Sequence, residues 1–277
     1  MTEMIQPMPE IELTDAERQR IKETAEKIDL TDSSLCLHYG TAGQKKLADV
    51  SDKLLKMTRK DDFDAIREWI SALVKELREC SHTKVQSGFF GWLFRGRERK
   101  KLRKQCETAM QNADRIAAEL EKHRSQLLRD FVMLGKLYDA VLEQYSALTV
   151  LTEAGQQKLN EDLSTEKELR ERFEKRLHDL NLSRVVCMQT LTQIRILQGC
   201  NTALSEKIQS LLTNTLALWK NQTALALTMK NTGQAMEDLR IANGKMVGVL
   251  NDVCKTEDNA LGEADILQEM IKSENMR

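Results

Sequence analysis

The sequence predicts an all-α protein, an elongated antiparallel helical hairpin or coiled-coil-like bundle with short N-terminal helices packed at one end. Three observations indicate this class. The only two prolines are Pro7 and Pro9, so everything after position 9 is free of this helix breaker. Aromatic residues make up only 4% of the chain and charged residues 31%, which suits thin helical layers better than a spherical core. Apolar residues also recur every three or four positions over long distances.

The first third of the chain predicts short helices. A first helix is expected over about 14–28, because Thr14 and Glu17 have the spacing of a capping box. A connector is expected over 29–43, and two more helices follow it. Their apolar positions recur at helical spacing: Leu47, Val50, Leu54 and Met57 in one, and Phe63, Ile66, Ile70, Leu73, Leu77 and Cys80 in the other.

Two long helices are expected in the rest of the chain. The stripe of the first alternates steps of three and four from Leu102 onward, and Gly155 with the polar run after it predicts a turn. The stripe of the second runs from Leu169 to Leu218, with interruptions expected at 199–201 and 231–233. Two long, similarly patterned helices joined by a short connection favour an antiparallel hairpin.

These elements predict one elongated domain. A disordered leader is expected over 1–12, followed by a single helical domain over 13–277. Within it, 13–96 would hold the short helices and an aromatic, glycine-bearing connector, 97–155 the first long helix, and 164–277 the second long helical region.

Charge and cysteine usage narrow the class of protein. The N-terminus lacks the basic start and apolar core of a signal peptide, and no run of eighteen apolar residues is present to span a membrane. The six cysteines are scattered without a C-x-x-C pair, which predicts reduced thiols and a cytoplasmic protein. With a net charge of −1 for the whole chain, nucleic acid is not an expected partner.

A segment rich in aromatic residues and then in bases interrupts the helical pattern. The bases give residues 95–104 a net charge of +6, seven bases against Glu98. One interpretation is that the aromatics plug the end of the hairpin. The alternatives are contact with an anionic membrane surface or with an acidic protein partner. The residues concerned are Phe89, Phe90, Trp92, Phe94, Arg95, Arg97, Arg99, Lys100, Lys101, Arg103 and Lys104.

Several blocks of the sequence resemble one protein family. The segment HYGTAGQKKLADVSDKLL (38–55), GFFGWLF (88–94), the segment 128–155 and the block 192–227 with its LWKNQ are similar, in order and spacing, to the TelA-like toxic-anion (tellurite) resistance family. The resemblance covers roughly residues 30–255. It implies an all-helical cytoplasmic protein linked to tellurite resistance and to envelope or phage stress. It implies no catalytic mechanism.

A polar set in the second long helix falls within the family-like block. Arg195 and Lys220 are candidates for receiving an oxyanion. The preferred interpretation is structural, because polar residues in a helical seam set register and partner choice. The set comprises Arg195, Gln198, Asn201, Trp219, Lys220, Asn221 and Gln222.

No pattern predicts a catalytic, metal or cofactor site. The four histidines form no i, i+4 pair with each other or with cysteine, so no metal site is expected. Gly40 and Gly43 do not fit a nucleotide-binding loop. The thiols are best interpreted as small buried hydrophobes, since a reductase needs a resolving cysteine or a redox cofactor.

The sequence therefore predicts a non-enzymatic helical scaffold in toxic-anion or envelope stress resistance. It would act by self-association or by binding a protein partner along its long helices, with a peripheral position at the inner membrane face as an option. No small-molecule substrate is identified. The alternative is a protein that binds an oxyanion directly or reduces tellurite through its thiols.

Overall fold

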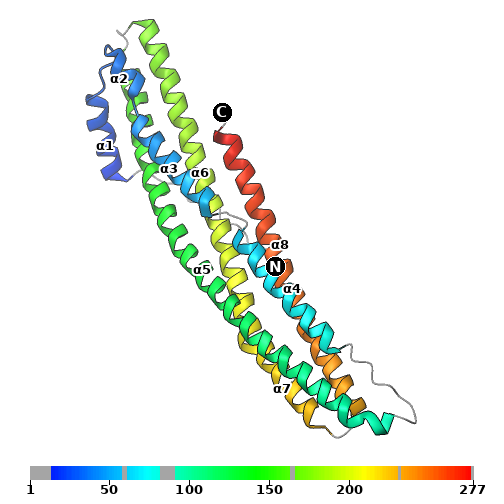
Figure 1. Ribbon diagram of the computed structural model, residues 1–277. Helices are drawn as coiled ribbons and strands as arrows, with labels where there is room; N and C mark the ends of the chain where they lie inside the picture. Colours follow the sequence, from blue (N-terminus) through cyan, green and yellow to red (C-terminus); the bar gives the residue numbers. More distant parts are fainter. Residues whose placement is uncertain (1–13, 58–60, 82–90, 163–165, 230–231, 276–277) are drawn as a thin grey trace. The chain divides into compact units, whose positions relative to one another are not determined.

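The computed structural model describes residues 14–57, 61–81, 91–162, 166–229 and 232–275. Every element in these ranges is a helix (Figure 1), which confirms the predicted all-α class. The elements are α1 (Asp15–Glu26), α2 (Ser33–His38), α3 (Thr41–Met57), α4 (Asp61–Ser81), α5 (Gly91–Glu161), α6 (Lys167–Ser210), the π-helix η1 (Leu211–Thr215), α7 (Leu216–Thr228) and α8 (Thr232–Asn275). The leader predicted over 1–12 lies outside the described residues.

Residue contacts divide the chain into two compact units. Unit 1 contains the described residues within Met1–Lys53 and Leu137–Thr192, and unit 2 those within Leu54–Lys136 and Gln193–Arg277. The single elongated domain expected from the sequence stays a prediction.

Unit 1 packs α1, α2 and the start of α3 against parts of α5 and α6 (Figure 1). The predicted capping box is present at α1, where the Thr14 side chain accepts a hydrogen bond from the Glu17 amide. The Glu17 carboxylate also accepts a hydrogen bond from the Ser146 hydroxyl of α5. Glu17 therefore takes part in the cap of α1 and also holds α1 against α5.

Besides a smaller apolar cluster of Cys106, Ala226 and Leu239, unit 2 has a large apolar core. Four layers contribute to it: α4, α5, the α6–η1–α7 run, and α8. Asp114 of α5 pairs with Lys220 of α7, and Phe131 of α5 accepts a hydrogen bond from Gln198 of α6. The later residue of α5 contacts the earlier residue of the α6–α7 run, so α5 is antiparallel to that run within the unit.

The boundaries of the long helices differ from the predicted ones. The first long helix begins at Gly91 rather than 97 and continues through Gly155 to Glu161. Gly155 does not break the helix. Its missing side chain makes room for Leu177, because a Cβ at this position would lie 2.5 Å from a methyl group of that leucine. Likewise α6 is unbroken across 199–201. Of the interruption predicted at 231–233, residues 232 and 233 belong to α8, which begins at Thr232, while α7 ends at Thr228.

The predicted apolar stripe fails at one place, where the π-helix lies. Leu218 was expected inside but is 56% exposed, whereas Trp219 is 2% exposed. The Leu216 amide bonds to the carbonyl of Leu211, five residues earlier, so the turn holds one extra residue. Buried positions therefore step by five from Leu211 to Leu216 and resume three–four spacing at Trp219, Thr223 and Ala226.

The shifted stripe places Trp219 in a buried polar contact between three helices. Its indole N–H donates to the Asn243 side-chain oxygen of α8 at 2.7 Å, and the Asn243 amide donates to the Leu77 carbonyl of α4 at 3.0 Å. Asn243 is itself 2% exposed. This asparagine therefore fixes α4, α7 and α8 in one register.

We expect Asn243→Ala to destabilise unit 2 by about 1–3 kcal/mol, because it leaves the buried indole N–H without an acceptor. Urea unfolding followed by circular dichroism measures the loss. Asn221→Ala on the exposed side of α7 is the matched control. Equal midpoints for the two variants would show that the Asn243 contacts do not stabilise the fold.

Candidate functional site

The structure describes only part of the aromatic–basic segment, residues 89–104. Phe89 and Phe90 lie outside the described residues, and nothing is described of the side chains of Trp92, Phe94, Arg95, Arg97 and Arg99, although their backbone belongs to α5. The later bases Lys100, Lys101, Arg103 and Lys104 are exposed. Arg103 pairs with Glu107 at 3.1 Å. The exposed bases thus form a cationic strip near the start of α5.

The predicted polar seam does not form one site. Arg195 is exposed and donates to the side-chain oxygen of Gln198, which lies buried and reaches the Phe131 carbonyl. Asn201 is 8% exposed, Asn221 is exposed and Gln222 half-buried. Lys220 pairs with Asp114.

Distance separates the two cations that were candidates for one oxyanion. Arg195 and Lys220 are 25 positions apart along consecutive helical elements, roughly 37 Å at 1.5 Å per residue. One small oxyanion cannot contact both side chains. Gln198 and Trp219 instead make contacts within unit 2 between helices, which is the behaviour of register-setting residues.

Two buried thiols, those of Cys36 and Cys187, are poorly suited to redox chemistry. Cys187 has no solvent exposure, and burial raises the pKa of its thiol to about 12. Burial also raises the pKa of Cys36, and the nearby Asp32 and Asp29 carboxylates add to this effect. Both groups are therefore protonated at neutral pH, whereas the thiolate is the reactive form.

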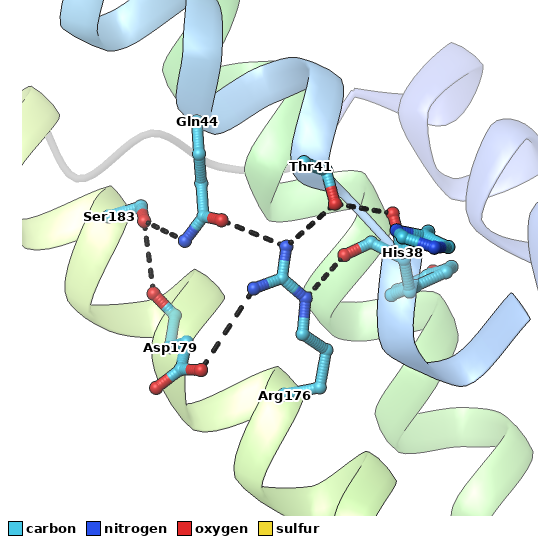
Figure 2. A network of polar contacts seen from close by, with 7 residues as sticks. His38, Thr41, Gln44, Arg176, Asp179 and Ser183 are labelled. Atoms are coloured by element: carbon cyan, nitrogen blue, oxygen red, sulfur yellow. Dashed lines mark hydrogen bonds and ion pairs between the residues drawn. The ribbon is translucent and has the colours of Figure 1, made fainter. Parts of the chain in front are cut away.

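A group of polar contacts that the sequence did not predict centres on Arg176 of α6 (Figure 2). Its guanidinium donates to the Tyr39 carbonyl at 2.7 Å, to Gln44 at 2.8 Å and to the Thr41 hydroxyl at 3.3 Å. Its side chain is only 16% exposed, and Asp179 lies 3.9 Å away. The guanidinium thus ties the turn between α2 and α3 to α6.

The turn bound by Arg176 has a conformation that its own residues dictate. Gly40 has a φ of +72°, and a Cβ there would lie 2.6 Å from Leu180, so this position requires glycine. Tyr39 donates its hydroxyl to the Leu151 carbonyl at 2.8 Å and stacks obliquely on Phe173, with ring centroids 5.2 Å apart. Both the backbone and the ring of Tyr39 are therefore held in place.

Gln44 extends the contacts of Arg176 along α6. Its amide donates to the Ser183 hydroxyl at 2.9 Å, and that hydroxyl donates to the Asp179 carbonyl. The sequence signal for this group is a charge directly beside the apolar positions Phe173, Leu177 and Leu180, since a buried charge needs partners. The stripe did not reveal which residues supply those partners.

The described residues offer no group of three or more His, Cys, Asp or Glu side chains positioned to hold a metal ion. Nor is any helix in the described ranges long and apolar enough to cross a membrane.

We expect Arg176→Met to loosen α2 and the start of α3 by about 1.5–3 kcal/mol, the range for hydrogen bonds to a charged group. Hydrogen–deuterium exchange of the amides in 33–50 measures this loss, with the amides of α8 as an internal reference. Lys175→Met, an exposed neighbour on α6, is the control. Unchanged protection in the Arg176 variant would contradict the anchoring role.

Comparison with known proteins identifies relatives over most of the chain. The model of the family described as "Toxic anion resistance protein (TelA)" matches residues 21–169 and 161–251. A TelA-like protein of Staphylococcus epidermidis is 32% identical over 259 residues, covering 83% of this chain and 69% of the relative. The uncharacterized protein YaaN of Bacillus subtilis is 32% identical over 255 residues, covering 81% and 66%. No solved structure matches the chain.

Proposed function

Because the chain belongs to the TelA family of toxic anion resistance proteins, we propose that it is a non-enzymatic helical scaffold in toxic-anion or cell-envelope stress resistance. The scaffold works by joining a second copy of itself along its helices and by resting on an anionic membrane surface. The support for the first part is a set of large apolar side chains that the fold leaves exposed, and for the second the bases near the start of α5.

One exposed apolar pair on α7 carries the self-association proposal. Leu218 and Leu225 are 56% and 64% exposed. They are seven residues apart, so they lie within about 20° of each other around the helix. The opposite side of the same helix already packs Leu216 and Trp219 into the core of unit 2. The pair therefore presents the a-to-a spacing of a helical seam to the outside.

A second copy of the chain is the partner that fits this pair. The chain has a net charge of −1, so two copies meet with little electrostatic repulsion. A two-fold axis would set each α7 against its counterpart, and the same two leucines would then serve both sides of the interface.

We expect the wild-type protein to sediment as a dimer or larger oligomer at tens of micromolar, and Leu218→Lys/Leu225→Lys to sediment as a monomer. The two lysines place four like charges in the symmetric interface. Thr202→Lys/Gln209→Lys adds the same charges at the same spacing on exposed positions of α6 and should leave the oligomer intact. A wild-type monomer at every concentration would refute self-association.

The membrane proposal rests on the exposed bases near the start of α5, which would place the protein at the inner face of the membrane. Each base near an anionic surface contributes about 1 kcal/mol. Lys100, Lys101 and Lys104 together therefore account for roughly a hundredfold in binding.

We expect the wild type to co-sediment with vesicles containing phosphatidylglycerol, and Lys100→Gln/Lys101→Gln/Lys104→Gln to remain in the supernatant. The control Lys45→Gln/Lys46→Gln/Lys53→Gln removes three exposed charges from α3 instead. Wild-type protein in the supernatant at low salt would remove the membrane from the proposal and leave self-association standing.

A further inference from the structure

A hollow of about 310 Å³ lies between α2 and α6 in unit 1. Its volume is at the lower end of the range for small-molecule sites, about 300–1,000 Å³. The α6 side contributes five positions separated by steps of three, three, one and three, which lie within about 120° of each other around the helix. The lining consists of Ser33, Cys36, Leu37, Leu169, Arg172, Lys175, Arg176 and Asp179.

The charges of the lining favour an anion. The lining residues alone hold three cationic side chains and one carboxylate, a formal net charge of +2. Outside the lining, Glu168 pairs with Arg172, and the Asp29 and Asp32 carboxylates lie near Cys36. Arg176 is committed to the turn between α2 and α3, as Figure 2 shows, and lies 3.9 Å from Asp179. Asp179, the single carboxylate of the lining, is therefore paired with Arg176, the cation that already holds other partners.

Two cations of the lining retain donors for a ligand. Arg172 has one terminal nitrogen on Glu168 at 2.6 Å, and a guanidinium has five N–H donors in all. Lys175 is exposed and has no ion-pair partner in the part of the chain that the structure describes. An arginine fork beside a lysine ammonium is a donor set suited to the oxygens of a phosphate group.

The lining also has an apolar part. Leu37 is 70% exposed, the largest exposed fraction among the large hydrophobic side chains of the described residues. Leu169 is half-buried, and Cys36 is 4% exposed with a protonated thiol, so it serves as a neutral wall. An apolar group bound here would cover leucine surface that the fold leaves in water.

We propose that this hollow binds a small organic phosphate, with Arg172 and Lys175 holding the phosphate and Leu37 and Leu169 contacting its apolar group. Arg176 acts as a positioning residue, because it fixes the α2–α3 turn against α6. The site is independent of the self-association surface on α7, so each proposal can fail without the other.

Phenyl phosphate and inorganic phosphate are the probes, titrated with the full chain at low salt and followed by phosphorus NMR line broadening. We expect saturable binding of phenyl phosphate and a weaker response to inorganic phosphate. Arg172→Ala/Lys175→Ala should weaken both at least tenfold. Lys45→Ala/Lys46→Ala removes two exposed charges from α3 and should change neither.

The apolar half of the site has its own variant. Leu37→Ser should weaken phenyl phosphate several-fold and leave inorganic phosphate unchanged, because only the organic probe reaches the leucine. Since Leu37 is exposed, the substitution does not disturb the core. Absence of saturation with phenyl phosphate, or equal weakening in the α3 control, would overturn the proposal by showing only diffuse attraction to surface charge.

The phosphate group could come from a soluble compound or from a lipid headgroup, and a competition distinguishes them. Vesicles of phosphatidylcholine with phosphatidic acid are added to the complex with phenyl phosphate. If the vesicles displace phenyl phosphate, and Leu37→Ser reduces this displacement, the result supports the site and assigns it to lipid phosphate. Retention of phenyl phosphate supports the site and assigns it to a soluble phosphate.

Discussion

The architecture depends on keeping an apolar stripe in contact with its neighbours along very long helices. An α-helix has 3.6 residues per turn, so a strict three–four repeat drifts slowly around the helix axis. Over the run from α6 to α7 the stripe remains inward because η1 holds one additional residue between Leu211 and Leu216. The contact between Trp219 and Asn243 exists only because of this correction. The register of α4, α7 and α8 therefore follows from one turn of altered pitch.

Patterns of three and four residues were sufficient to predict the class of fold, the capping box at Thr14 and the inward positions of α5. They were insufficient where geometry depends on a partner. Gly155 is a residue type that predicts a helix break, but here it provides room for Leu177 of the neighbouring helix. Leu218 fits the repeat by spacing, but the preceding π-helix turns it outward. No local preference of these residues encodes such outcomes, because they are decided by what lies opposite.

Arg176 illustrates a different limit of sequence reasoning. A charge directly beside an apolar stripe needs polar partners when it is buried. The partners of Arg176 are a backbone carbonyl and two polar side chains from the start of α3 and the turn before it. Those partners depend on the left-handed backbone at Gly40. The pocket beside Arg176 was equally invisible, since it combines α2 with a face of α6 that is far away in sequence. Tertiary contacts alone bring these residues together.

The π-helix also changes how this stretch of the chain can vary. Loss of one residue within 211–215 would turn the five-residue step from Leu211 to Leu216 into a step of four, as in an uninterrupted α-helix. The later side chains would keep their orientation, and Trp219 would still face Asn243. A one-residue deletion elsewhere in α6 or α7 removes no such extra residue, so it would rotate all later side chains by about 100°. Alignments of relatives should therefore place a one-residue gap, where one is needed, between Leu211 and Leu216.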